Sequence, residues 1–218
     1  MLRRFQDEYY YHIYNRGVDK RQVFLDKWDY TRFLESLREF NQFEATGGFY
    51  RKFLASKFRG LTPNLGVRPP GQKKLVRIIA YCLNPNHYHL LLRQNIENGV
   101  SEFMKRMGAG YSGYFNYKYK RSGSLFGGKY KVKEAKSIFD VIKLSIYVNC
   151  NSEIHSLARK ENWPWSSYLD YVGVRRGKLC EAEEVLREFS NPEDYKRFCE
   201  QLMPDIRAIK NLERYGLE

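Results

Sequence analysis

The chain is 218 residues long, and its content of 43% hydrophobic and 16% aromatic residues is sufficient for one sizeable folded core. Its formal net charge of +13 indicates a polyanionic partner, most often nucleic acid. No apolar stretch approaches the roughly 20 residues that span a bilayer, and the N-terminus lacks an apolar signal region, so we expect no membrane partner. Four cysteines without a CxxC pair argue against a zinc cluster or a disulfide scaffold, and they indicate free thiols in the cytoplasm.

The first half of the chain alternates strand and helix patterns. Aromatic and β-branched residues predict a first strand over 8–15, and an amphipathic repeat behind an aspartate N-cap predicts a helix over 26–41. Residues 41–74 are rich in glycine, proline and basic residues, which indicates an inserted, partly mobile loop. Strands are predicted over 75–82 and 87–93, and the turn sequence LNPN between them favours a hairpin.

The second half continues this alternation. A helix is predicted over 99–119, and a glycine-rich turn then leads into a fourth strand. Residues 137–151 read as a further helix that begins at the N-cap residue Ser137. Two more helices are predicted over 180–190 and 192–203.

These elements predict an α+β fold in which an antiparallel sheet carries helices on one face. We expect one domain over residues 1–152, with the 41–74 segment inserted into it. A small helical appendage over 153–218 would complete the chain.

The segment from Lys105 to Lys133 concentrates the positive charge, with eight basic residues and no acidic one. Five tyrosines and two phenylalanines lie among them. Because positive charge follows phosphates and aromatic faces stack on unpaired bases, this mixture suits single-stranded nucleic acid. The alternative, that each aromatic residue faces the core of a helix, stays open.

His87 and His89 are the first residues that indicate chemistry. Successive side chains of a strand point to opposite faces, so the two histidines share a face and Tyr88 points away from it. Two neutral imidazoles about 7 Å apart on one face can share a divalent metal ion. Without a third ligand, however, such a pair is more often structural.

Residues of the helix predicted over 137–151 can supply that third ligand. Tyr147 and Asn151 are four residues apart, so they lie one turn apart on the same face. A tyrosine hydroxyl acts as a nucleophile when it is aimed at an electrophile that a metal polarises, and the nearby amide oxygen can complete the metal's ligands. On these residues alone, the end of a buried helix is the simpler interpretation.

Four stretches of the chain together resemble the single-tyrosine HUH transposases, specifically the REP-associated tyrosine transposases and their insertion-sequence relatives. These stretches are YYHIYNRG, AYCLNPNHYHLLL, RSGSLFGGKYK and LSIYVNCN, followed by PWSSY. They extend over residues 8–171 apart from the 41–74 segment. The His-hydrophobe-His signature of the family falls on residues 87–89.

The tyrosine helix of the family aligns with residues 147–152, which places the nucleophile at Tyr147 and the amide ligand at Asn151. Asn149 and Ser152 depart from the family pattern. An alignment shifted by two residues would put Ser145 at the nucleophile position and imply an inactive enzyme, but the LSIY sequence favours the first alignment.

The resemblance implies a ferredoxin-like, RNA-recognition-like fold with the two histidines on a central strand and the tyrosine helix beside it. It implies that Tyr147 attacks the scissile phosphate of single-stranded DNA with hairpin ends, leaving a 5′-phosphotyrosine link and a free 3′-hydroxyl. It also implies that His87, His89 and Asn151 hold Mg²⁺ or Mn²⁺, which polarises the phosphate.

On this interpretation, basic residues near the scissile phosphate hold the DNA backbone. They are Lys105, Arg106, Lys118, Lys120, Arg121, Lys129 and Lys131. Arg16 and the 41–74 segment are candidates for contacts to bases.

Three further hypotheses compete with this one. The first is a domesticated, non-cleaving DNA-binding protein of the same fold, which the departures at Asn149 and Ser152 would suit. The second is an RNA-binding module, but the chain lacks its aromatic strand motif. The third, a replication initiator or relaxase, fits the chain length and the tyrosine helix less well. For the transposase we expect a monomer or homodimer in the cytoplasm, associated with the nucleoid while it binds DNA.

Overall fold

The computed structural model describes residues 5–43 and 73–215, with side chains up to Lys210. The insertion expected over 41–74 therefore lies outside the described residues except at its two ends. In the described ranges, no helix is both long enough and apolar enough to cross a membrane.

In the part of the chain that the structure describes, four strands form one antiparallel sheet in the order β2-β3-β1-β4. They are β1 (Tyr10–Arg16), β2 (Val76–Asn84), β3 (His87–Gln94) and β4 (Lys131–Ala135). Helix α1 (Lys27–Glu39) connects β1 to β2, and α3 (Gly99–Lys118) connects β3 to β4. This β-α-β-β-α-β order is that of a ferredoxin-like fold, so the predicted fold class is confirmed.

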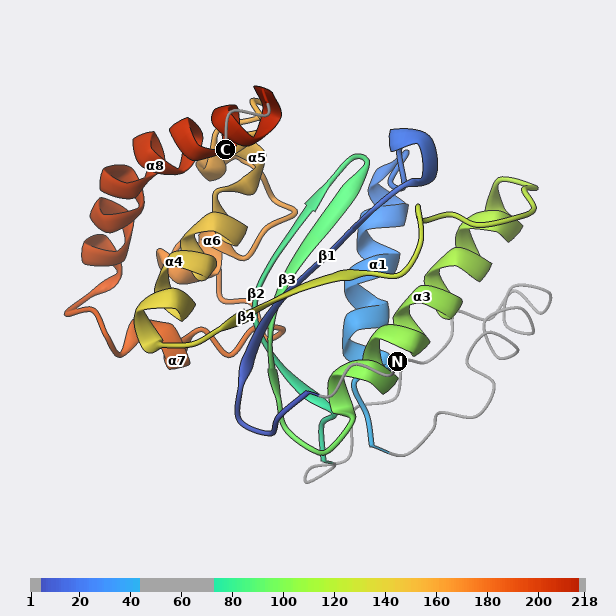
Figure 1. The fold of residues 1–218 in the computed structure, drawn as a ribbon, viewed down its shortest axis with the longest axis horizontal. Helices are drawn as coiled ribbons and strands as arrows, with labels where there is room; N and C mark the ends of the chain where they lie inside the picture. The colour runs from blue at the N-terminus through green and yellow to red at the C-terminus, as the bar shows by residue number, and fades with distance from the viewer. Residues whose placement is uncertain (1–4, 44–72, 216–218) are drawn as a thin grey trace.

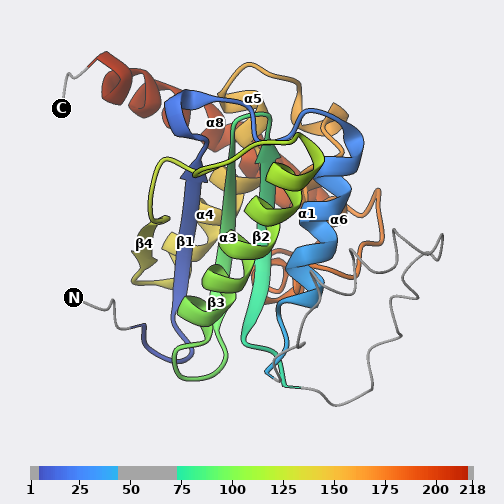
Figure 2. The same ribbon diagram turned by 90° about the vertical axis from the view of Figure 1, so that its right-hand side faces the viewer.

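Helices α1 and α3 cover one face of the sheet, as Figure 2 shows with both helices in front of the strands. The core on this face contains Phe33 and Leu37 from α1, Phe103 and Tyr111 from α3, and Tyr88 from β3. Helix α1 begins where the sequence predicts, because the side chain of its N-cap aspartate accepts hydrogen bonds from the backbone of the first turn.

Helices also cover the second face, which extends the prediction of helices on one face. Figure 1 shows α4 (Ile138–Asn149), α6 (Tyr168–Tyr171), α7 (Glu183–Leu186) and α8 (Pro192–Tyr215) on the opposite side of the sheet from α1 and α3. Strands β2 and β3 are buried along nearly their whole length, and Ile79, Cys82 and Leu91 contribute to this second core. Central strands that are apolar on both faces need a cover on each of them.

The end of the tyrosine helix differs from the prediction of one helix over 137–151. Helix α4 begins at the predicted N-cap Ser137 but ends at Asn149, and a separate turn, α5 (Asn151–Ile154), follows Cys150. Asparagine and serine side chains compete for backbone hydrogen bonds and are poor helix formers, which accounts for the interruption. Two single-turn 3₁₀ helices, η1 (Val18–Lys20) and η2 (Lys160–Asn162), complete the described elements.

Candidate active site

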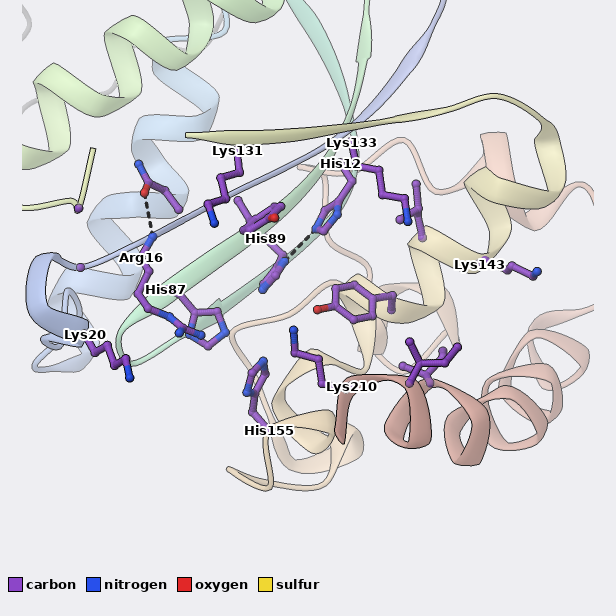
Figure 3. A pocket seen from close by; sticks show the side chains of 18 of the residues that line it. His12, Arg16, Lys20, His87, His89, Lys131, Lys133, Lys143, His155 and Lys210 are labelled. Carbon is purple, nitrogen blue, oxygen red and sulfur yellow. Dashed lines mark hydrogen bonds between the residues drawn. The ribbon is translucent and has the colours of Figure 1, made fainter. Parts of the chain in front are cut away.

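A pocket of about 1050 Å³ lies against the second face of the sheet. Its walls come from β1, β3 and β4, from α4, from His155 just after α5, and from α8. Figure 3 shows that the labelled histidines and basic side chains gather in this pocket. The chain has four histidines, and all four line it.

His87 and His89 lie on one face of β3, and Tyr88 is buried in the core on the other face. The Nδ1 atom of His87 lies 2.5 Å from Oδ1 of Asn86, and its Nε2 atom lies 2.9 Å from Nδ2 of Asn84. An amide nitrogen is a donor and an amide oxygen an acceptor, so Nδ1 carries the proton and Nε2 keeps its lone pair. This tautomer leaves Nε2 suited to bind a metal.

Asn151 faces the same nitrogen of His87. Its Oδ1 atom lies 3.3 Å from Nε2 of His87 and accepts a hydrogen bond from Asn84, while its buried Nδ2 atom has no partner among the described residues. Two ligand atoms at about 2.1 Å from one ion and about 90–110° apart are about 3.0–3.4 Å from each other. The separation of the amide oxygen and the imidazole nitrogen therefore fits a shared ion.

His155 completes the cluster, and the sequence interpretation missed it. One potential ligand atom from each of His87, His89 and His155 lies within 4.8 Å of the other two. His155 is four residues beyond Asn151, and its backbone N–H donates to the Asn151 carbonyl at 3.1 Å. Extending the four-residue spacing from Tyr147 through Asn151 by one more step would have indicated it.

His12 is the fourth histidine, and it is also absent from the predicted site. It lies on β1, diagonally across from His89 on β3, with its Nε2 atom 2.8 Å from Nδ1 of His89. Both rings are buried, and their planes are nearly parallel. Because Nδ1 of His89 is engaged with His12, Nε2 of His89 is the nitrogen left for a metal.

Burial keeps all four imidazoles neutral. Desolvation, aided by nearby positive charge, lowers the pKa of His12 and of His87 to about 3, and that of His155 to about 4. Burial, followed by the neighbouring histidines, lowers the pKa of His89 well below its usual value. Neutral imidazole is the form that binds metals, so this cluster is chemically suited to a cation at neutral pH.

Tyr147 lies on α4 and lines the pocket, half-buried. Its ring centroid is 5.5 Å from those of His12 and His89, and the rings meet edge to face. Ser145, the nucleophile of the shifted alignment, is fully buried, and its hydroxyl lies 3.2 Å from the hydroxyl of Tyr195 on α8. The pocket therefore holds the tyrosine, and the serine lies within a packed interface between helices.

Comparison with known families bears on this arrangement. Residues 67–151 match the family model of IS200-like transposases. The match includes the histidine pair, Tyr147 and Asn151, and it confirms the resemblance over this region. A solved structure of a REP-associated tyrosine transposase bound to a REP hairpin is 12% identical in sequence, with a TM-score of 0.48. That alignment covers 83% of this chain and 95% of the other. No curated protein matches the chain.

Asn149 and Ser152, the two departures from the tyrosine-helix pattern, are both buried. Asn149 donates to the Tyr195 hydroxyl at 2.8 Å and accepts from the Ser167 hydroxyl at 2.5 Å. Ser152 is fully buried, and its hydroxyl has no partner among the described residues. Asn149 thus joins α4 to α8 and to the loop before α6, which gives this departure a packing role.

The structure brings only some of the predicted DNA-contacting residues to this pocket. Arg16, Lys129 and Lys131 line it. Four more lysines, which the sequence interpretation did not select, also line it: Lys20, Lys133, Lys143 and Lys210. Among the described lining residues, these seven basic side chains are accompanied by two acidic ones, Asp19 and Asp205, so the pocket is suited to a polyanion.

The remaining predicted DNA contacts lie elsewhere. The ammonium of Lys118 is 2.8 Å from a carboxylate oxygen of Asp26 and 2.7 Å from one of Asp29, and Arg106 pairs with Glu102 at 2.8 Å. Lys105 lines a second, smaller pocket, while Lys120 and Arg121 line neither of the two. A net positive charge along a segment does not distinguish paired lysines from unpaired ones.

Proposed function

We propose that this protein is a metal-dependent single-stranded DNA endonuclease and strand transferase, a transposase that acts through a 5′-phosphotyrosine link. The observation that carries the proposal is the position of Tyr147 beside His89 and His12 in a basic pocket. The ring centroid of Tyr147 is 5.5 Å from that of each histidine. The match of residues 67–151 to IS200-like transposases supports it.

In the proposed reaction, the hydroxyl oxygen of Tyr147 attacks the phosphorus of the scissile phosphate. A bond forms between that oxygen and phosphorus as the bond from phosphorus to the 3′-oxygen breaks. The proton of the tyrosine hydroxyl is transferred, in net terms, to the departing 3′-oxygen, which leaves as a free hydroxyl. The reverse attack by a 3′-hydroxyl on the phosphotyrosine rejoins a strand, so the reaction needs no nucleoside triphosphate.

His87, His89 and Asn151 are proposed to hold Mg²⁺ or Mn²⁺, and a bound ion would polarise the phosphate and offset its developing negative charge. Asn84 and Asn86 orient the His87 ring, and His12 orients the His89 ring. These contacts hold the nitrogen lone pairs of His87 and His89 in fixed directions.

Arg16, Lys129 and Lys131 are proposed to hold the DNA backbone next to Tyr147, because they line the same pocket. The resemblance to REP-associated transposases leads us to propose single strands with hairpin ends as the substrate. We propose a cytoplasmic monomer or homodimer, associated with the nucleoid while bound to DNA, whose catalytic domain extends to about residue 152.

The test is a cleavage assay on 3′-end-labelled single-stranded oligonucleotides from the sequence that flanks the gene. With Mg²⁺ or Mn²⁺, we expect a covalent protein–DNA adduct on a denaturing gel. The adduct should disappear in Tyr147→Phe and His87→Ala and with a chelator. Tyr9→Phe is the matched control, because Tyr9 is 43% exposed and does not line the pocket.

The second candidate is a non-cleaving DNA-binding protein of the same fold. It predicts tight DNA binding without an adduct on any flanking oligonucleotide and with any metal ion. Tight binding to folded wild-type protein with no adduct would therefore favour this candidate over the transposase.

A further inference from the structure

We propose that His155 is a direct metal ligand, so that three imidazoles and one amide oxygen hold the ion. This makes the site selective for a later first-row transition-metal ion, such as Co²⁺, Ni²⁺ or Zn²⁺, over Mg²⁺. The inference rests on the proposed function in one respect, because it concerns the same metal site. It adds a ligand and a class of metal that the sequence pattern does not include.

The first support is geometric. The potential ligand atoms of His87, His89 and His155 all lie within 4.8 Å of one another. The ring centroids of His87 and His155 are 4.7 Å apart, and those of His87 and His89 are 5.2 Å apart. Nitrogens at about 2.0–2.1 Å from one tetrahedral ion lie about 3.3–3.4 Å from one another, so binding an ion would draw these atoms together by at most about 1.5 Å.

The second support is the way in which the chain holds His155. Helix α5 starts at Asn151, and His155 follows it directly, so both side chains come from the same turn. Lys160 and Arg207 each form an ion pair with Glu153 in this turn, at 3.5 Å and 2.9 Å. The turn is therefore fixed to η2 and to α8, which limits the positions that His155 can take.

The third support is that the ring nitrogens of His155 are not otherwise used. Within the described part of the chain, no hydrogen bond to the His155 ring is present, whereas His89 uses one nitrogen to bind His12, and His87 binds Asn86 through Nδ1 and Asn84 through Nε2. His155 therefore keeps both ring nitrogens for a cation and His89 keeps Nε2, while a cation at Nε2 of His87 would replace the hydrogen bond from Asn84. His155 is only partly buried, so an ion has access from the pocket.

The choice of metal follows from the ligand types. Mg²⁺ prefers oxygen ligands such as carboxylates and waters, and imidazole suits the later transition metals. The cluster of three histidines contains no carboxylate, and Asn151 contributes a single neutral oxygen. The described residues thus form a nitrogen-rich site, and affinity should rise from Mn²⁺ to Co²⁺ and Ni²⁺.

The test is a titration of the metal-free full chain with Co²⁺, Zn²⁺ and Mg²⁺. Binding is measured by calorimetry and, for Co²⁺, also by the visible absorption of the bound ion. Loss of an orienting neighbour typically costs 10–100-fold in metal affinity, so loss of His155 in His155→Gln should weaken Co²⁺ and Zn²⁺ binding by about 100-fold or more. Its Co²⁺ spectrum should also change, because the spectrum depends on the number and type of ligands. Mg²⁺ affinity should change little.

Leu157→Ala is the matched control, since Leu157 is 45% exposed just beyond the same turn and does not line the pocket. Thermal unfolding in the presence of a chelator establishes that each variant is folded. If His155→Gln binds Co²⁺ with wild-type affinity and spectrum while His87→Ala does not bind it, His155 is not a ligand and the inference is overturned, although the proposed metal site stands.

The inference and the proposed function fail in different ways. Co²⁺ binding that depends on His155, in a wild-type protein that forms no DNA adduct, would support the ligand assignment and count against the strand transferase. Wild-type adduct formation with Mg²⁺, together with no measurable binding of Co²⁺ or Zn²⁺ by the folded protein, would overturn the inference and leave the function in place.

Discussion

The Nε2 atom of His12 lies 2.8 Å from the Nδ1 atom of His89, across the pairing of β1 with β3. Both rings are buried and neutral, so one of the two facing nitrogens donates and the other accepts. If Nδ1 of His89 donates, its Nε2 atom has a free lone pair directed at the metal site. His12 is therefore a positioning residue, which acts through the ligand His89.

The His12→Ala variant tests this relationship. Losing the neighbour that sets the tautomer of a ligand should weaken metal binding by about 10–100-fold. Adduct formation should then require a correspondingly higher metal concentration and recover at saturation. The measurement is adduct yield against metal concentration, with Tyr14→Phe as control because Tyr14 also stacks on His89. An unchanged metal dependence in His12→Ala would rule out the positioning role.

Lys118 has a structural role on the other side of the molecule. Its ammonium contacts Asp29, which is fully buried at the start of α1 and also accepts hydrogen bonds from the hydroxyls of Tyr114 and Tyr119. Removing one partner of a buried ion pair costs about 3–5 kcal/mol, and the remaining hydrogen bonds reduce the expected loss for Lys118→Met to about 2 kcal/mol.

Urea unfolding of Lys118→Met measures this loss, and Lys120→Met is the matched control because Lys120 is exposed. Single-stranded DNA affinity should be the same for both variants once they are folded. A Lys118→Met protein of wild-type stability that has lost DNA affinity would return Lys118 to the DNA contacts that the sequence predicts.

Local pattern accounts for what could be predicted from the sequence. The two-residue period of a strand places His87 and His89 on one face, and the N-cap residues Asp26 and Ser137 mark the starts of α1 and α4. The nearly continuous apolar run of β2 also contained a signal for helices on both faces of the sheet, although we predicted one covered face.

Tertiary pairing accounts for what could not be predicted. His12 meets His89 only because β1 pairs with β3, 77 residues further along the chain. His155 follows α5, and its ring meets that of His87 on β3, 68 residues earlier in the chain, with the centroids 4.7 Å apart. The contact of His12 with His89 has no local sequence signal, and the four-residue spacing that leads to His155 indicates the residue but not its contact with His87.

Glu39 provides a prediction about the dependence of stability on pH. It is partly buried near Arg32, with its Oε2 atom 3.5 Å from the guanidinium, and desolvation raises the pKa of Glu39 to about 7. The folded state therefore binds more protons than the unfolded state between about pH 4.5 and 7. The contribution of Glu39 to stability is fully present below about pH 4.5 and is lost as the pH rises through 7.

In Glu39→Gln, the side chain stays neutral at every pH. We expect the variant to be more stable than the wild type at pH 8 by about 1–2 kcal/mol, and to lose that advantage near pH 5. Urea unfolding at both pH values measures the difference. Glu35→Gln is the matched control, because Glu35 also lies near Arg32, at 3.7 Å, but is more exposed. Equal effects of the two substitutions at both pH values would contradict the prediction.

Lys131 and Lys133 provide the prediction that separates the pocket from the general basic surface. Both are exposed on β4 and line the pocket with the histidines. Each phosphate contact on a single strand contributes about 0.7 to the slope of log affinity against log salt concentration, so Lys131→Ala with Lys133→Ala should reduce that slope by about 1.4. Lys105→Ala with Lys120→Ala removes the same charge outside this pocket and should leave the slope close to the wild-type value.

Fluorescence anisotropy of a labelled oligonucleotide over a range of salt concentrations measures both slopes. Equal reductions in the two double variants would show that DNA binding depends on total charge, and that the pocket has no special part in it.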